Sequence, residues 1–241
     1  MKLSNNKILI TGGASGIGLG LAARFIEEGN KVIIAGRRKF LLDEVSEKYP
    51  SIITRGADLR IAREREDLYN WISKEHPDMN VLVNNAGIQQ RMKIADSNFF
   101  ALAKDEIAIN IEAPLHLISL FSNLKSLDTI INITSGLAYA PMAVMPVYCA
   151  SKAFFHSFTL SLRHQFKPKN IEVIELIPPA LNTDLGGKGI HTNAPPVSEF
   201  IETVFSQLKS GKTEISSGFS EAMTKATPDD LQKTFNRMNS V

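Results

Sequence analysis

The residues best suited to chemistry are a tyrosine and a lysine one helical turn apart. Tyr148 and Lys152 are i and i+4 in the segment 147–166, which has apolar residues at helical spacing and no interior Pro or Gly, so both side chains share one helix face. A nearby ammonium group favours the phenolate, and we expect it to lower the pKa of the Tyr148 phenol from about 10. Such a phenol can act as a general acid or base near neutral pH.

Ser135 is a third candidate for the same site. It follows residues 129–134, an apolar and β-branched run that is typical of a buried strand. At the end of that strand, the Ser135 hydroxyl would bind the same substrate oxygen as Tyr148. A Tyr and a Lys at this spacing are also common on solvated helix faces, so the pair has to be judged with the rest of the chain.

A glycine-rich turn near the start of the chain predicts a phosphate site. It lies between a short apolar strand, residues 7–11, and a helix expected from about residue 17 to 28. Glycines let the backbone approach a pyrophosphate, and the helix N-terminus offers free N–H groups and the positive end of its dipole. We expect a dinucleotide to contact Gly12, Ser15, Gly16, Ile17 and Gly18.

The end of the second strand, residues 31–35, predicts which dinucleotide is bound. An acidic residue there would hold the ribose 2′-hydroxyl, but this chain has Gly36, Arg37 and Arg38. A guanidinium pairs with a phosphate in a forked, charge-assisted geometry. We therefore expect NADP(H), with Arg37 as the main contact and Ser15 as a helper; the arginines could also form a solvated helix start, and NAD(H) stays possible.

Taken together, these motifs resemble those of the short-chain dehydrogenase/reductase family. The likeness lies in Thr11-Gly-Gly-Ala-Ser-Gly-Ile-Gly18, Asn84-Asn-Ala-Gly87, Ser135 and Tyr148-x-x-x-Lys152. It covers about residues 7–183, fades beyond Leu185, and from Ser135 through Pro179 is most similar to the bacterial DltE-type oxidoreductases. It implies hydride transfer between a nicotinamide cofactor and a carbonyl or secondary alcohol, with Tyr148 as the proton donor or acceptor.

The resemblance also implies roles for residues that would otherwise be unremarked. Asn110 would support a proton relay from Tyr148 through Lys152 and a water molecule, and Lys152 would bind the ribose hydroxyls. Pro114 leaves the Asn110 carbonyl without its helical donor, so we expect a kink in the helix of residues 99–124. Further cofactor contacts are expected from strand ends: Asp58, Leu59, Asn85, Ala86, Gly87, Pro178 and Thr183. Asp58 and Thr183 also suit helix N-caps.

The elements that must position these residues alternate between strand and helix along the chain. This alternation predicts an α/β fold, a Rossmann-like doubly wound parallel sheet of about seven strands with helices on both faces. The 241 residues fit a single domain, and ligands of such sheets bind at the carboxyl ends of the strands. Residues 185–196 are glycine-rich and are expected to form a substrate lid, and the tail of residues 217–241 one amphipathic helix after Pro228.

Composition limits the partners. A net charge of +2, from 27 Lys and Arg against 25 Asp and Glu, gives no general attraction to nucleic acid, and no apolar run is long enough to insert into a membrane. One cysteine, without a signal-peptide core at the N-terminus, is typical of a cytoplasmic protein. We expect a small-molecule substrate, no metal and, from the family, a homodimer or homotetramer. Two alternatives stay open: an NAD(H)-preferring dehydrogenase, and a dinucleotide-binding regulator with little catalysis.

Overall fold

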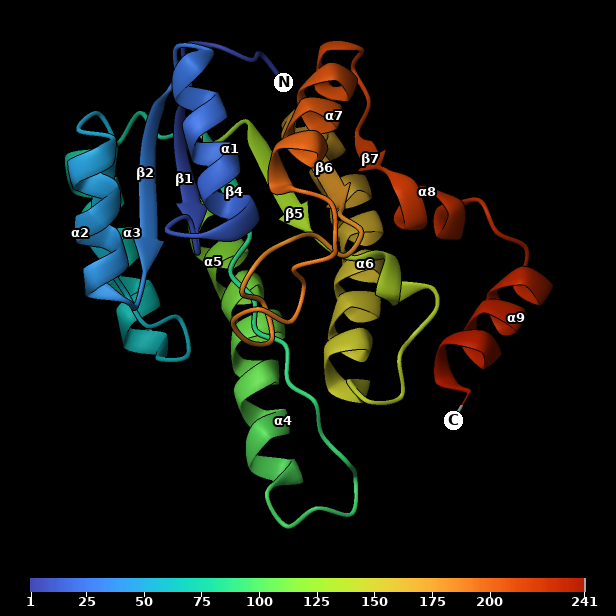
Figure 1. Ribbon diagram of the computed structural model, residues 1–241. Coiled ribbons are helices and arrows are strands. Elements are labelled where there is room, and N and C mark those ends of the chain that lie inside the picture. Colours follow the sequence, from blue (N-terminus) through green and yellow to red (C-terminus); the bar gives the residue numbers. More distant parts are fainter. Residues whose placement is uncertain (241) are drawn as a thin grey trace.

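In the computed structural model, which describes residues 1–240, seven strands form one sheet in the order β3-β2-β1-β4-β5-β6-β7 (Figure 1). Every neighbouring pair is parallel, and the central strands are runs of Ile, Leu and Val buried on both faces, as parallel sheets require. The predicted doubly wound parallel sheet is confirmed. The strands are β1 (Lys7–Thr11), β2 (Lys31–Gly36), β3 (Ile53–Gly56), β4 (Val81–Asn84), β5 (Thr129–Ile133), β6 (Glu172–Ile177) and β7 (Glu214–Ser216).

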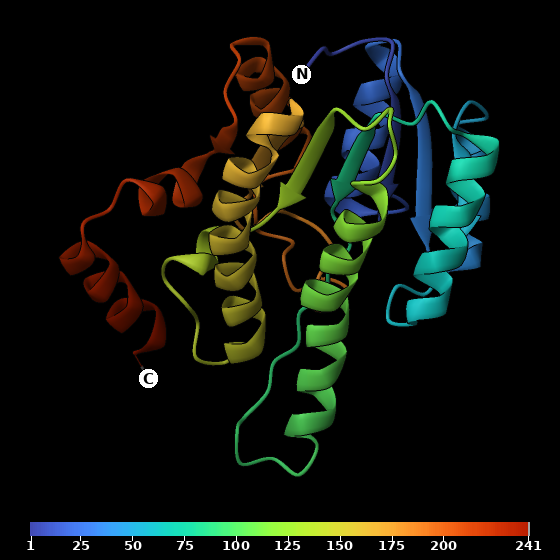
Figure 2. The ribbon, with the colours of Figure 1, turned by 180° about the vertical axis from the view of Figure 1, so that it is seen from behind.

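Helices cover both faces of the sheet and bury a separate apolar layer on each. On one face, α1 (Gly16–Glu27), α2 (Lys39–Lys48) and α7 (Val197–Lys209) pack their apolar sides on the strands. On the other lie α3 (Ala62–Glu75), α5 (Ala113–Phe121) and α6 (Pro146–Phe166), with α5 and α6 towards the viewer in Figure 2. A one-turn 3₁₀ helix, η3 (Lys167–Lys169), ends α6.

The helix expected over residues 99–124 is interrupted by a π-helical turn. It consists of α4 (Phe99–Ile107), the π-helical η1 (Ala108–Glu112) and α5, which follow one another without a break. Pro114 has no N–H to give to the carbonyl of Asn110, and the wider turn, rather than a break in the helix, accommodates it. Such turns are frequent at functional sites, and this one contains Asn110.

The C-terminal tail forms two helices instead of the single helix that the sequence predicted. The additional helix is α8 (Gly218–Thr224), and the expected one is α9 (Pro228–Asn239), which begins with a capping box made by Thr227 and Asp230. Figure 1 shows α9 beyond the β7 edge of the sheet. The Asn239 side chain bonds the loop before α6: it donates to the Pro141 carbonyl at 3.0 Å and accepts from the Ala143 N–H at 2.6 Å.

Candidate active site

A cavity of about 960 Å³ lies at the carboxyl ends of the strands, where ligands of such sheets bind. The structure brings most of the predicted site residues to its walls. Gly18 and Asn110 are not among the lining residues. Those at the walls are Gly12, Ser15, Gly16, Ile17, Arg37, Arg38, Asp58, Leu59, Asn85, Ala86, Gly87, Ser135, Tyr148, Lys152, Pro178 and Thr183.

The glycine turn between β1 and α1 is held against the end of β4, where Gly12 and Gly18 have no space for a side chain. Asn85 donates from Nδ2 to the carbonyls of Thr11 and Gly12, at 2.9 and 3.1 Å. A Cβ on Gly18 would lie 2.4 Å from that same Nδ2, and Gly16 has a positive φ of 54°. The turn therefore leads the backbone past the cavity to the N-terminus of α1, a cradle into which a dinucleotide pyrophosphate fits.

Basic side chains follow β2, at the end of the cavity lined by the glycine turn. Arg37 and Arg38 both line the cavity, and Arg38 donates to the Ser15 hydroxyl at 2.9 Å. No carboxylate from the end of β2 faces them. The structure thus places the predicted anion-binding residues side by side, with Arg38 rather than Arg37 in contact with Ser15.

Asp58 follows β3 and is paired with Arg60. The Arg60 guanidinium lies 2.6 Å from Asp58 Oδ2 and holds the pKa of that carboxyl below its usual value. The N-cap of α3 is Ile61, so the alternative of Asp58 as the helix cap does not apply. Thr183 faces the glycine turn: its Cγ2 lies 3.3 Å from the position of a Cβ built on Gly16.

The three residues expected to carry the chemistry meet where β5 ends and α6 begins. Tyr148 and Lys152 are 5 % and 7 % exposed, and the Lys152 Nζ is 5.8 Å from the centre of the Tyr148 ring. The same Nζ donates to the Ile133 carbonyl at 2.8 Å. Ser135 follows β5 and caps a one-turn 3₁₀ helix, η2 (Gly136–Ala138), by accepting from the Leu137 N–H.

The pKa of Tyr148 is shifted in the direction opposite to the one expected from the sequence. Burial raises it, and contact with the Ser135 hydroxyl opposes that shift only in part. Burial also lowers the pKa of Lys152 to about 8. The expectation was wrong for this structure because desolvation of the phenolate outweighs a lysine whose ammonium group is directed to a backbone carbonyl. The phenol is therefore protonated at neutral pH.

Asn110 lies behind Lys152, beside a second and much smaller cavity. Its Oδ1 accepts from the Ile88 N–H and its Nδ2 donates to the Ile88 carbonyl, both at 2.9 Å. The small cavity, of about 10 Å³, is lined by Asn84, Asn110 and Lys152, among others. Asn84 Oδ1 is buried and has no hydrogen-bond partner within residues 1–240. This volume and these polar groups suit one water molecule.

The sequence did not indicate that the C-terminal tail reaches the cavity. Phe219 and Ser220 of α8 and Met238 of α9 line it, near the Met142 and Met145 side chains of the loop before α6. Phe219, Met238 and the two methionines of this loop thus add apolar side chains to the cavity wall. The tail's only signal in the sequence is a few apolar residues among polar ones, because the docking of α8 and α9 depends on contacts between distant segments.

A buried carboxylate on α4 was also missed. Glu106 is 0 % exposed; its Oε1 accepts from the Gln90 N–H at 2.5 Å, and its Oε2 has no partner among the described residues. Burial raises the pKa of Glu106 to about 7. In the sequence it is one of several charged residues of an amphipathic segment, and nothing sets it apart.

Comparison with known proteins gives a consistent result. A sequence model of the family described as short chain dehydrogenase matches residues 6–194. The chain is 44 % identical to the uncharacterized oxidoreductase DltE of Bacillus subtilis, over 100 % of this chain and 99 % of that protein. It is 30 % identical to the NADP-dependent 3-hydroxy acid dehydrogenase YdfG of Salmonella typhi, over 71 % of each chain.

Solved structures share the fold along the whole chain. A short chain dehydrogenase from Burkholderia cenocepacia in complex with NADP superposes with a TM-score of 0.86 and 24 % identity, covering 100 % of both chains. One from Burkholderia phymatum in complex with NAD superposes with a TM-score of 0.84 and 16 % identity, covering 100 % of this chain and 99 % of that one. Within residues 1–240, no helix is long and apolar enough to cross a membrane.

Proposed function

The chain belongs to the short chain dehydrogenase family, and from that premise we propose that it transfers a hydride between NADP(H) and a carbonyl or secondary alcohol. The observation that carries the proposal is that Tyr148, Lys152 and Ser135 line the same cavity as the glycine turn. When bound there, a nicotinamide cofactor supplies or accepts the hydride. The protein's own residues position the substrate and move the proton.

The proton chemistry follows from the burial of Tyr148 and Lys152. In the reductive direction, the Ser135 hydroxyl holds the substrate oxygen and the protonated Tyr148 phenol donates to that oxygen as it gains negative charge. Lys152, with a pKa of about 8, is mostly charged at neutral pH and stabilises the phenolate that remains, besides binding the ribose hydroxyls. The small cavity that Asn84 and Asn110 line beside Lys152 would hold one water molecule, through which a proton returns to Tyr148 by way of Lys152.

The preference for NADP(H) rests on the end of β2. Arg37 and Arg38 are free of a neighbouring β2 carboxylate that would repel a 2′-phosphate, and Ser15, already bonded to Arg38, lies next to them. A forked guanidinium contact suits a phosphate. The NADP dependence that the name of the Salmonella relative states supports the same choice, while the NAD complex of the Burkholderia phymatum protein keeps NAD(H) as the alternative.

The substrate end of the cavity points to the kind of carbonyl compound. Met142, Met145, Leu185, Phe219 and Met238 line it, and such apolar, flexible walls suit a ketone or alcohol with an apolar substituent. We further propose that residues 185–196, whose Gly186, Gly187 and Gly189 have positive φ, close over the substrate as a lid. The single cysteine, buried Cys149, suits the reducing cytoplasm that we propose as the location.

The test of the function is the Tyr148→Phe variant, assayed by NADPH oxidation with a panel that includes acetophenone and 2-octanone. We expect at least a thousandfold loss of kcat with nucleotide affinity, measured by calorimetry, within threefold of the native protein. Tyr69→Phe is the matched control, since it removes a phenol hydroxyl from α3, outside the cavity, and should leave both values unchanged. Retained turnover in Tyr148→Phe would refute the mechanism, and tight NADPH binding without turnover of any carbonyl by the native protein would favour the regulator.

A further inference from the structure

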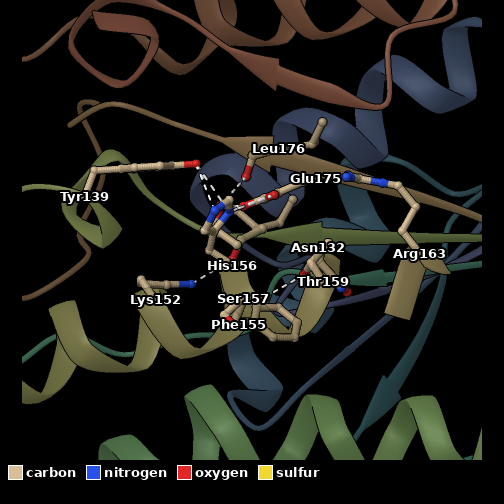
Figure 3. Close-up of polar contacts among 12 residues, drawn as sticks. Asn132, Tyr139, Lys152, Phe155, His156, Ser157, Thr159, Arg163, Glu175 and Leu176 are labelled. Atoms are coloured by element: carbon tan, nitrogen blue, oxygen red, sulfur yellow. Dashed lines mark hydrogen bonds and ion pairs between the residues drawn. The ribbon is translucent and has the colours of Figure 1, made fainter. Parts of the chain in front are cut away.

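A fully buried carboxyl group lies on β6 and faces α6, the helix that contains Tyr148 and Lys152. Glu175 is 0 % exposed, and its Oε1 and Oε2 are 2.9 and 3.1 Å from Nδ1 of His156 on α6. Figure 3 shows the two side chains facing each other between strand and helix. A carboxylate at this depth is costly unless a charged or hydrogen-bonding partner compensates it, so the pair fixes the distance between α6 and β6.

The same carboxylate also holds the end of β5. Thr134 donates from Oγ1 to Glu175 Oε1 at 2.6 Å, and its backbone N–H donates to the Leu176 carbonyl at 2.9 Å. Thr134 is 1 % exposed and is followed directly by Ser135. Any shift of Glu175 would therefore be transmitted to the residue that precedes the substrate-binding hydroxyl.

Helix α6 contacts this strand end at two points that are one helical turn apart. Tyr148, Lys152 and His156 are spaced i, i+4 and i+8 along α6, so they lie on one side of the helix. Lys152 bonds directly to the carbonyl of Ile133, and His156 reaches the next residue, Thr134, through Glu175. We propose that His156 and Glu175 are positioning residues that hold Tyr148 and Ser135 in register for the reaction; this inference rests on the proposed function.

The charges around His156 favour its protonated form. The hydrogen bond with Glu175 raises the pKa of His156, burial opposes this, and Glu214 on β7 raises the pKa while Arg163 on α6 lowers it. Arg163 itself donates to the carbonyls of Val173 and Thr213. The hydroxyl of Tyr139 lies 3.3 Å from His156 Nδ1. The hydrogen bond with Glu175 thus favours the protonated form of His156 over the neutral one, and deprotonation of His156 as the pH rises would weaken the contact that holds Thr134.

The experiment compares the native chain with Glu175→Gln, in which the side chain keeps its shape and can still accept from Thr134 but loses its charge. The backbone amide signals of Thr134, Ser135 and Leu137 are followed by NMR between pH 6 and 10, together with the ring signals of the five histidines. We expect the three amides to titrate with His156 in the native chain. In Glu175→Gln the His156 midpoint should fall towards about 6.5, and the amides should lose that titration.

The kinetic arm measures kcat for acetophenone reduction across the same pH range. In Glu175→Gln we expect kcat at pH 7 to be at least tenfold lower than in the native chain and NADPH affinity to stay within twofold of it. The part of the pH–kcat curve that follows the titration of His156 should be lost. Thr159→Val is the matched control, because it removes a neutral contact between α6 and β5, the hydrogen bond that Asn132 Nδ2 donates to Thr159 at 2.9 Å. It should change kcat less than threefold and leave the pH dependence of kcat unaltered. His156→Gln replaces Glu175→Gln if the latter does not fold.

Each outcome decides the proposal. Native Ser135 and Thr134 amides that do not follow His156 would overturn it, as would a kcat loss in Thr159→Val as large as that in Glu175→Gln, since the pair would then be one of several equivalent structural contacts. If the native chain reduces no ketone, the proposed function fails, whereas the NMR titration still decides whether the pair positions the strand end.

Discussion

At the scale of single residues, Glu106 and the pair of His156 and Glu175 show two ways of burying a carboxylate. Glu175 is hydrogen-bonded to the His156 imidazole ring and to the Thr134 hydroxyl, whereas the polar contact of Glu106 is one backbone N–H. Desolvation therefore dominates at Glu106 and raises its pKa to about 7. A carboxyl group whose native pKa exceeds its unfolded value of about 4.3 contributes stability that is present at low pH and is lost as the pH rises through 7.

We predict that Glu106→Gln removes this loss. In the native chain the Glu106 contribution to the free energy of unfolding should fall by about 3 kcal/mol between pH 4 and pH 8, since each pKa unit is worth about 1.4 kcal/mol. In the variant, which cannot ionise, the curve should be flatter by that amount, so that Glu106→Gln is the more stable chain at pH 8. Urea unfolding at the two pH values measures this, and parallel curves would contradict it. Asp105→Asn, at a half-exposed neighbour, is the control.

Arg37 is a second single residue with a testable role, the predicted preference for NADP(H). In Arg37→Asp a carboxylate would repel the 2′-phosphate and could accept from a ribose 2′-hydroxyl. We expect the native chain to bind NADPH at least tenfold more tightly than NADH, which is about 1.4 kcal/mol, and the variant to lose or reverse that preference. Calorimetric titration with both nucleotides measures it, and Arg91→Asp, outside the residues that line the cavity, is the control. A preference that survives in Arg37→Asp would move the assignment to Arg38.

At the scale of elements, the sequence predicted the strands and most helices because each carries its own periodic pattern. The runs of β-branched residues in β1, β4 and β5 and the glycine turn after β1 are local signals of this kind. Helix α8 was missed because it is short and begins at Gly218, and the docking of α9 could not be predicted because it depends on Asn239 meeting a loop about a hundred residues earlier. The direction of the Tyr148 pKa shift was missed for a similar reason, since burial is a property of the assembled fold.

We predict that α9 affects the affinity for the substrate and not the affinity for the nucleotide. A chain that ends at Ala226 lacks Met238 and the two hydrogen bonds of Asn239. We expect KM for 2-octanone to rise at least fivefold and NADPH affinity to stay within twofold, because the glycine turn and Arg37 are far along the sheet from α9. Steady-state kinetics and calorimetry separate the two. A comparable loss of NADPH affinity would contradict the prediction, and Asn239→Ala shows how much of the effect the loop contact carries.

At the scale of the whole molecule, the helices that pack side by side on one face leave apolar side chains outside. Phe100 on α4 and Phe154 on α6 are 72 % and 39 % exposed. Figure 2 shows these two helices in the layer that faces the viewer. Apolar surface that recurs on neighbouring helices is typical of a face buried between subunits. The oligomer expected from the family therefore has a candidate interface here.

We predict a dimer or tetramer for the native chain and a shift towards monomer for Phe154→Glu. Light scattering after size-exclusion chromatography gives the mass directly. Phe40→Glu is the matched control, because Phe40 is 61 % exposed on α2, which covers the opposite face of the sheet, and should leave the mass unchanged. A native monomer would contradict the expected assembly, and an unaltered oligomer in Phe154→Glu would place the interface elsewhere.

The cavity is built by two parts of the chain, and the family model matches only one of them. The residues proposed for nucleotide binding and for catalysis lie within residues 6–194, the stretch that matches the family, whereas Phe219, Ser220 and Met238 come from the tail beyond it. We therefore expect substitutions in the tail to alter the substrate wall of the cavity and to leave the residues proposed for the reaction in place. Chimeras in which residues 1–216 of this chain are joined to the tails of relatives would be a direct route to enzymes with new substrate ranges.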